Sequence, residues 1–426
     1  MYIFIGILLY FESFITGIPF LDYSDKLAIG AVIIFLGYHF LIKKDFKKWF
    51  FKIIESRQIL FFLSLLLVSV LSLLITDIGI SKDNLFSLKI LFFCFIFFLF
   101  FAYIGFEYKK IRKVVFMFVV LEVITCIFSL VTLYFPAEFL NIFEKIVPES
   151  TFGFYEEEII RGRVAPIGAL MGVYLLPLFF IEGKNKVKSI FYWIVFVLGC
   201  LAILLHSYRG DVVAMFLGLT FFGIVFFLKS KSKHFYLKYL IFSFFVIFLI
   251  GLNLPIARRF MLKDDYDIQT INSRRRYASV ALDLFEAEKI FGVGYGNYQK
   301  IADPMVVNTF GGGKQKTVSL PGSPHNQFLS WLSETGLVGS LGFVTLLMVF
   351  VLDDFKYIRR NKYPKPLILV LMISSWVLVV VSLLNSMAIN LFYVFYAIRG
   401  MLLGNSLIDN NVTICSNDKN ENSNRS

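Results

Sequence analysis

Long apolar runs, separated by short polar segments, recur along almost the whole chain. Each run has roughly 17 or more residues, mainly Leu, Ile, Val and Phe, so each can cross ~30 Å of hydrocarbon as a helix. The pattern predicts an all-α polytopic transmembrane helix bundle of about twelve spans within residues 1–408. The expected spans lie near residues 2–20, 27–43, 59–76, 85–106, 114–136, 164–181, 189–205, 211–228, 239–255, 326–352, 366–384 and 388–407.

Two long polar segments interrupt this pattern, at residues 137–163 and 256–325. A loop as long as the second usually has a function or is disordered. We do not expect disorder, because the sequence RRRYASVALDLFEAEKI is amphipathic at the 3.6-residue period, with Ser273 before it as an N-cap, and the glycines of FGVGYGNY end it. The segment 256–325 is therefore predicted to be a partly helical functional loop, whereas the polar tail 409–426 is predicted to be disordered.

The composition agrees with a membrane protein. Hydrophobic residues make up 58% of the 426 residues and aromatic residues 18%, whereas soluble domains are roughly half apolar and a quarter charged. The formal net charge of +12 by itself suggests a nucleic-acid partner. However, the excess lies in alternate short loops, as the positive-inside rule requires, so nucleic acid is excluded. These basic loops lie at residues 43–52, 109–113, 184–188, 229–233 and 356–365.

With the basic loops in the cytoplasm, both termini are expected to be cytoplasmic and both long polar segments extracytoplasmic. The four cysteines show neither the spacing of a metal site nor a disulfide framework. No cluster of carboxylates suggests a divalent ion either. The sequence therefore predicts neither a metal ion nor a cofactor.

Several arginines lie on the expected outer face, where the positive-inside rule disfavours cations. They are Arg161 and Arg163 before the sixth span, Arg209 in the turn HSYRGD, the pair Arg258 and Arg259, and the run Arg274, Arg275 and Arg276. A guanidinium group is a rigid fork of donors that suits phosphate oxygens, so these residues are candidates for binding a pyrophosphate whose lipid tail stays in the bilayer. Alternatively, an arginine at a span end only anchors the helix to lipid phosphates. This alternative is weakest for Arg209, because its turn is short.

One histidine and one glutamate are placed where chemistry is expected. His325 stands directly before the tenth span, and a neutral imidazole, with an ordinary pKa of about 6.5, can take a proton from a hydroxyl as a general base. The alternative is that SPHN is only a helix N-terminus capped by Ser323. Glu334 lies within the apolar run, where a carboxylate is costly unless it is paired or functional. Arg399 in the last span is one candidate partner.

Three segments together resemble the bacterial O-antigen ligase and O-antigen polymerase superfamily. They are SPHNQFLSWLSETGLVG at 323–339, similar to a His-Asn, apolar, Glu-x-Gly-x-x-Gly signature, SYRGD at 207–211, and SRRRYASVALDLF with FGVGYGNYQ between 273 and 299. Their order matches the superfamily from about residue 114 to the end. Two departures, Tyr208 before Arg209 and the absence of a Pro-Asn pair in RGRVAP at 161–166, leave open which arginine of each group binds phosphate.

The resemblance implies an inner-membrane glycosyltransferase, metal-independent and inverting, whose donor is an undecaprenyl diphosphate-linked oligosaccharide. His325 would take the proton from the acceptor hydroxyl, while arginines bind the diphosphate and stabilise its developing charge. The residues that the resemblance assigns are His325 and Arg209 as catalytic, Arg161, Arg163, Arg274 and Arg275 as diphosphate-binding, and Asn326, Glu334 and Gly336 as supporting.

Two activities are known within the superfamily. A polymerase uses a second lipid-linked glycan as acceptor, whereas a ligase transfers the glycan to the lipid A core, and the segments SPHNQFL and GVGYGNY resemble polymerases more. A chain-length regulator and a flippase are the expected partner proteins. From another class, a transporter or flippase for a lipid-linked glycan would use the same arginines without a base. A carrier presents its site near the midplane and to both sides, so the arginines on one face argue against it.

Overall fold

The computed structural model describes residues 24–42, 44–117, 265–302, 326–361, 364–384 and 392–408, together with Pro324 and short stretches between residues 120 and 224. All regular structure in these ranges is helical, and no strand occurs in them. The prediction of an all-α protein is therefore confirmed for this part of the chain.

Three of the described helices are long and apolar enough to cross a membrane, namely Arg57–Ile75, Asn84–Gly105 and Gln327–Arg360. Three shorter apolar helices are Leu27–Ile42, Leu367–Leu383 and Phe392–Ile408. All six coincide with expected spans. The other expected spans lie wholly or partly outside the described residues, so a total of about twelve stays a prediction.

The amino-terminal helices begin at clear capping residues. After α2 (Ser24–Ile42) and α3 (Lys44–Ile54), helix α4 (Arg57–Ile75) starts at Ser56, whose side chain accepts a hydrogen bond from the N–H of Ile59. Helix α5 (Lys82–Gly105) starts with a capping box in which Ser81 and Asn84 bond each other's backbone. The short α3 was not expected within the basic loop. Its apolar side, with Trp49 and Phe46, packs on Tyr103 of α5.

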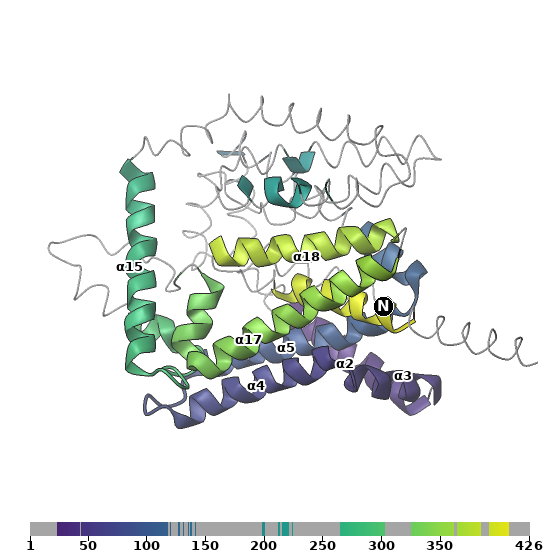
Figure 1. Cartoon of the computed structure of the whole chain (residues 1–426), viewed down its shortest axis with the longest axis horizontal. Coiled ribbons are helices and arrows are strands. Elements are labelled where there is room, and N and C mark those ends of the chain that lie inside the picture. Colours follow the sequence, from purple (N-terminus) through teal and green to yellow (C-terminus); the bar gives the residue numbers. More distant parts are fainter. Residues whose placement is uncertain are drawn as a thin grey trace, which may run out of the picture.

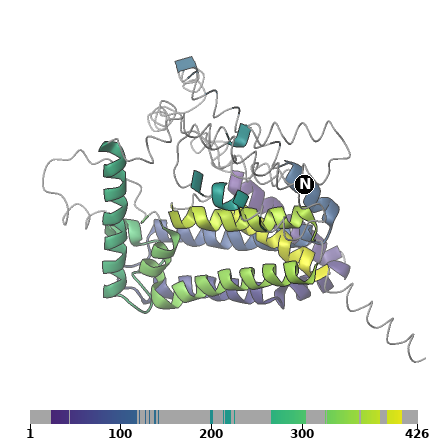
Figure 2. The same ribbon diagram turned by 45° about the horizontal axis from the view of Figure 1, so that its top comes forward.

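Helix α4 runs beside α17 (Gln327–Arg360) and packs against α5, and α15 (Asp265–Ala287) stands across one end of this bundle (Figures 1 and 2). Aromatic rings fill the space between the helices. The ring of Phe62 on α4 lies 5.9 Å from that of Phe98 on α5, which in turn lies 6.3 Å from Phe350 on α17. The helix Phe392–Ile408 joins this core through Tyr396, 4.7 Å from Phe62.

Helix α15 differs from the expected helix at its amino-terminal end. It begins at Asp265, so Ser273 lies inside the helix, and its predicted role as an N-cap is wrong. The amphipathic pattern identified the helix but not its start.

The expected tenth and eleventh spans are α17 and α18 (Pro366–Leu384). The bounds of α18 match the prediction. Helix α17 continues beyond the expected residue 352 to Arg360, and it contains a break that the apolar pattern does not reveal. At Gly336 the backbone angles are φ 61° and ψ −157°, which interrupts the helix and turns its first part away from the rest (Figure 1).

Candidate functional site

The glycine segment, defined here as residues 291–298 (FGVGYGNY), lies against the break in α17. A break in a helix leaves backbone N–H and C=O groups without partners inside the helix, and burial without partners would be costly. The glycine segment supplies these partners before Gly336, and Lys289 and Ile290, which directly precede the segment, supply them after it. The bonds are Val293 N–H to Ser333 O (3.0 Å), Gly294 N–H to Glu334 O (2.9 Å), Leu337 N–H to Lys289 O (2.8 Å) and Val338 N–H to Ile290 O (3.2 Å).

Two glycines make this close approach possible. Gly336 and Gly292 both have positive φ, 61° and 66°, a conformation that L side chains rarely adopt. A Cβ atom on Gly292 would lie 2.5 Å from the carbonyl carbon of Glu334, and one on Gly336 would lie 2.5 Å from that of Ile290. Gly336, assigned a supporting role from the sequence, is therefore the point where the two backbones meet.

Glu334 stabilises the same junction with its side chain. Its carboxylate accepts hydrogen bonds from the backbone N–H groups of Gly296 and Tyr298, the latter at 3.3 Å to Oε1. The sequence indicated that this carboxylate needs a partner, and the partner is the glycine segment.

Arg399, which the sequence offered as that partner, is paired elsewhere. Its Nη1 lies 2.7 Å from Oδ2 of Asp354, and it also donates to Ser375 and to the Phe350 carbonyl. Asp354 follows Glu334 by about 20 residues on α17, which is ~30 Å of helix axis. The pairing of Glu334 with Arg399 is therefore wrong, because the two side chains lie at opposite ends of the bundle.

The carboxyl-terminal end of α4 contacts the other side of the glycine segment. The Ser72 hydroxyl accepts a hydrogen bond from the Tyr295 N–H at 3.2 Å, and the Thr76 hydroxyl donates to the Val293 carbonyl at 3.1 Å. The Tyr295 ring packs on that of Trp331, with centroids 5.2 Å apart. Burial, with a smaller contribution from the charge of Glu334, raises the pKa of Tyr295 well above its ordinary value, so the phenol stays neutral.

Helix α15 is attached to the glycine segment by a small core of its own. The Tyr298 hydroxyl donates to the Tyr277 carbonyl at 2.6 Å, and both rings are buried with apolar side chains of α15. Leu329, in the first turn of α17, packs against the same core. One face of α15 therefore looks toward the start of α17.

This orientation of α15 distinguishes Arg274 from Arg275, the two arginines between which the sequence did not decide as ligand of the diphosphate. Arg274 precedes Tyr277 by three residues and so lies on the same face of α15. It is half-buried, whereas Arg275 is exposed. The structure thus brings Arg274, but not Arg275, to the side of α15 that faces the start of α17.

Asn326 has a structural role at the start of α17. Its Oδ1 accepts from the Leu329 N–H at 3.1 Å, which makes it the N-cap, and its Nδ2 donates to the Leu383 carbonyl on α18 at 3.1 Å. The suggestion that Ser323 caps this helix is therefore wrong. His325, Arg209, Arg161 and Arg163 lie outside the described residues, and His325 immediately precedes this cap in the sequence.

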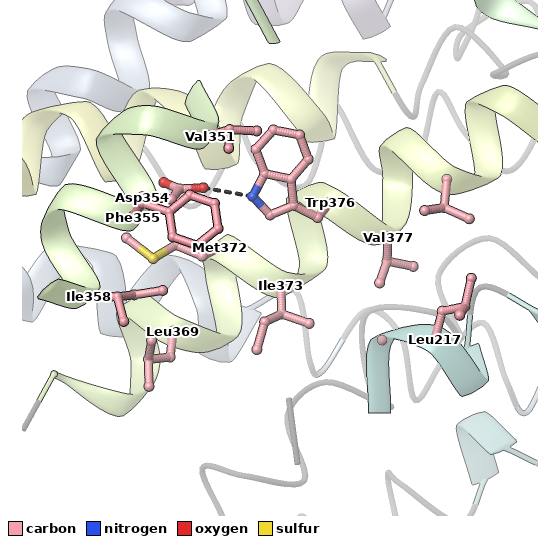
Figure 3. A pocket seen from close by; sticks show the side chains of 12 residues that line it. Leu217, Val351, Asp354, Phe355, Ile358, Leu369, Met372, Ile373, Trp376 and Val377 are labelled. Carbon is pink, nitrogen blue, oxygen red and sulfur yellow. Dashed lines mark hydrogen bonds between the residues drawn. The ribbon is translucent and has the colours of Figure 1, made fainter. Parts of the chain in front are cut away.

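A cavity of about 410 Å³ is lined by α17, α18 and the residues Leu217 and Gly218, at the end of the bundle that holds Asp354 (Figure 3). Its lining is apolar apart from Asp354, whose Oδ2 accepts from Trp376 Nε1 at 2.7 Å. None of its described lining residues is a cation that would bind a diphosphate. The cavity is therefore separate from the candidate site at the glycine segment.

Comparison with known proteins identifies one family. Residues 194–344 match the model of the family described as O-antigen ligase. The matched range contains all three segments on which the resemblance rests, at 207–211, between 273 and 299, and at 323–339. No curated protein matches the chain. The match confirms the resemblance to the O-antigen ligase and polymerase superfamily.

Proposed function

Because residues 194–344 match the O-antigen ligase family, we propose that the protein is a membrane glycosyltransferase that polymerises undecaprenyl diphosphate-linked repeat units of a surface polysaccharide. One observation carries the proposal. The glycine segment joins α15 to the start of α17, so that the face of α15 with Arg274 is turned toward the start of α17. In the sequence, His325 immediately precedes the N-cap of that helix. A diphosphate ligand and a base for the acceptor are thereby supplied from two elements held by one core.

The proposed reaction is a single displacement at the anomeric carbon. His325 takes the proton of the acceptor hydroxyl, whose oxygen forms the new bond to the anomeric carbon from the face opposite the leaving group. The old bond to the diphosphate oxygen breaks, and its electron pair stays on the diphosphate. Arg274 and Arg209 stabilise that negative charge, together with Arg161 or Arg163. The configuration of the sugar is inverted, and undecaprenyl diphosphate is released.

Supporting roles in the proposal follow from the contacts. Asn326 caps α17 directly after His325, and its second bond to the Leu383 carbonyl holds this cap against α18. Glu334 and Gly336 keep the glycine segment docked at the break of α17. These three residues therefore hold the base and Arg274 in a constant relative position without taking part in bond making.

A ligase is the second candidate function, and the description of the matched family favours it. In that case the same donor and residues are used, and the acceptor is the lipid A core rather than a second lipid-linked glycan. The sequence segments SPHNQFL and GVGYGNY favour the polymerase. For both activities we expect the protein in the cytoplasmic (inner) membrane, which contains the lipid-linked donor. In the proposed orientation, the site lies on the outer face of this membrane.

The test is reconstitution of the purified protein in lipid vesicles without added metal, with undecaprenyl diphosphate-linked repeat units as the only sugar source. We expect wild type to form ladders of several repeats and His325→Ala to form none. His39→Ala is the matched control, because His39 lies on α2, where its ring bonds to the Phe35 carbonyl of the same helix. It should keep wild-type ladders.

The other results separate the alternatives. If wild type forms no ladders but transfers the glycan once lipid A core is added, the protein is a ligase. If His325→Ala keeps full activity in whichever assay works, the proposed base is wrong. If no assay shows transfer while vesicles take up the lipid-linked glycan, the transporter alternative replaces the enzyme.

A further inference from the structure

Asn84 connects α5 to the glycine segment from inside the protein. Its side chain is completely buried, at 0% exposure. Its Nδ2 donates to the Tyr295 carbonyl at 2.9 Å and to Asn297 Oδ1 at 2.8 Å. Its Oδ1 accepts from the N–H of Ser81 at 2.8 Å as part of the capping box of α5. One amide thus joins the start of α5 to a segment more than 200 residues away.

The partner amide of Asn297 is equally buried, at 0% exposure. Its Nδ2 donates to the Val293 carbonyl at 2.9 Å, which closes the glycine segment on itself, while its Oδ1 receives Asn84. A buried amide without partners would destabilise the fold, and satisfied networks of this kind favour one arrangement. The pair therefore holds the glycine segment at one place on α5.

A displacement of the glycine segment would also displace the two helices of the proposed site, α15 and the first part of α17. Tyr298 follows Asn297 directly and makes the bond to the Tyr277 carbonyl on α15. Its N–H is also bonded to Glu334 in the first part of α17. The contacts thus run from Asn84 through the glycine segment to the helix that carries Arg274 and to the helix that follows His325.

We propose that Asn84 is a positioning residue. It anchors the glycine segment to α5 and thereby fixes α15 and the start of α17 relative to the amino-terminal helices α4 and α5. Asn84 lies outside the matched family range 194–344, whereas its partners Tyr295 and Asn297 lie inside it. The amino-terminal helices thus take part in the site by holding it. The catalytic consequence rests on the function proposed above, while the structural one does not.

The informative variant is Asn84→Asp. Aspartate has the same shape and keeps an oxygen for the Ser81 N–H, so the cap of α5 remains. It loses both donors, and it places a carboxylate against the Tyr295 carbonyl and Asn297 Oδ1. The matched control is Ser81→Ala, which weakens the same cap and leaves the two bonds to the glycine segment in place.

The measurement is the distance between two nitroxide labels by pulsed electron paramagnetic resonance in lipid vesicles. The labels are attached at Leu74→Cys on α4 and Glu286→Cys on α15, both exposed, after the native cysteines are replaced by alanine. We expect one narrow distance distribution for the parent and for Ser81→Ala. Asn84→Asp should give a distribution at least twice as broad. Its apparent KM for the lipid-linked donor should rise at least fivefold at an unchanged folded fraction.

Two results overturn the proposal: an unchanged distribution in Asn84→Asp, or a broadened one with unchanged transfer kinetics. If the parent shows no transfer at all, the proposed function fails, and the distance measurement still decides whether Asn84 fixes α15. If Asn84→Asp does not fold, Thr76→Val decides instead. It keeps the shape of the side chain and removes the bond to the Val293 carbonyl, together with the long contact of 3.5 Å from the Ile78 N–H in the exposed turn, and it should broaden the distribution as well.

Discussion

Arg274 and Arg275 are neighbours in the sequence with different surroundings. Because Arg274 shares a face of α15 with Tyr277 and Arg275 is exposed, we expect Arg274→Ala to lower kcat/KM for the lipid-linked donor at least tenfold. Arg275→Ala should stay within about twofold of wild type. Steady-state kinetics of donor consumption in vesicles measure both, and the Arg275 variant is the control for loss of one positive charge. Equal losses in the two variants would contradict the register argument.

Arg399 and Asp354 form a buried ion pair, with side-chain exposures of 1% and 9%. Removing one partner of such a pair leaves an uncompensated charge and costs about 3–5 kcal/mol. We expect Arg399→Ala to lower the apparent melting temperature in detergent strongly. Arg57→Ala is the matched control, because Arg57 is 66% exposed and lies 3.8 Å from Asp353. Exposed pairs contribute only about 0–1 kcal/mol. A similar melting temperature in both variants would show that the pair is dispensable.

At the scale of elements, the break in α17 allows a direct test. Gly336→Ala introduces a Cβ at φ 61° and against the backbone of Ile290, so we expect the glycine segment to undock, with transfer reduced at least tenfold and a lower melting temperature. Gly342→Ala is the control in the same helix, because the nearest atom to its new Cβ is Leu65 Cδ1 at 3.5 Å. Alanine has the higher helix propensity by about 1 kcal/mol, so Gly342→Ala should not lose stability. Full activity in Gly336→Ala would exclude a role for the break.

The existence of elements could be predicted better than their details. The bounds of α18 agree with the apolar run, because a run of uniform hydropathy ends where polar residues begin. Helix α15 was predicted from its amphipathic period, but its first turns are polar and carry no such signal. The break at Gly336 was also missed. A glycine in an apolar run is compatible with an intact helix, and only the approach of Gly292 decides otherwise.

At the scale of the whole molecule, hydrogen bonds place the turn after α4, the glycine segment and the break of α17 at one end of the bundle. The loop charges predict that this end is extracytoplasmic. In spheroplasts, a membrane-impermeant maleimide should therefore label Asp77→Cys and Glu286→Cys. Lys356→Cys, at the far end of α17, should react only after permeabilisation. The reverse pattern would overturn the orientation and, with it, the outward placement of the site.

Membrane spans can be predicted from the sequence alone, because long apolar runs are stable in hydrocarbon. In the bilayer, such a run must also form a helix, since only then are its backbone N–H and C=O groups hydrogen-bonded within the segment. The sequence also indicated that Glu334 needs a partner, and it predicted that α15 and the glycine segment belong to one functional loop. Only the tertiary structure decided which groups meet. Contacts between distant residues determine that Asn84 pairs with Asn297 and Arg399 with Asp354. They also determine which face of α15 looks toward α17, and this is the face with Arg274. Such contacts leave no periodic trace along the chain, since hydrophobic periodicity reports which face of a helix is buried but not which helix covers it.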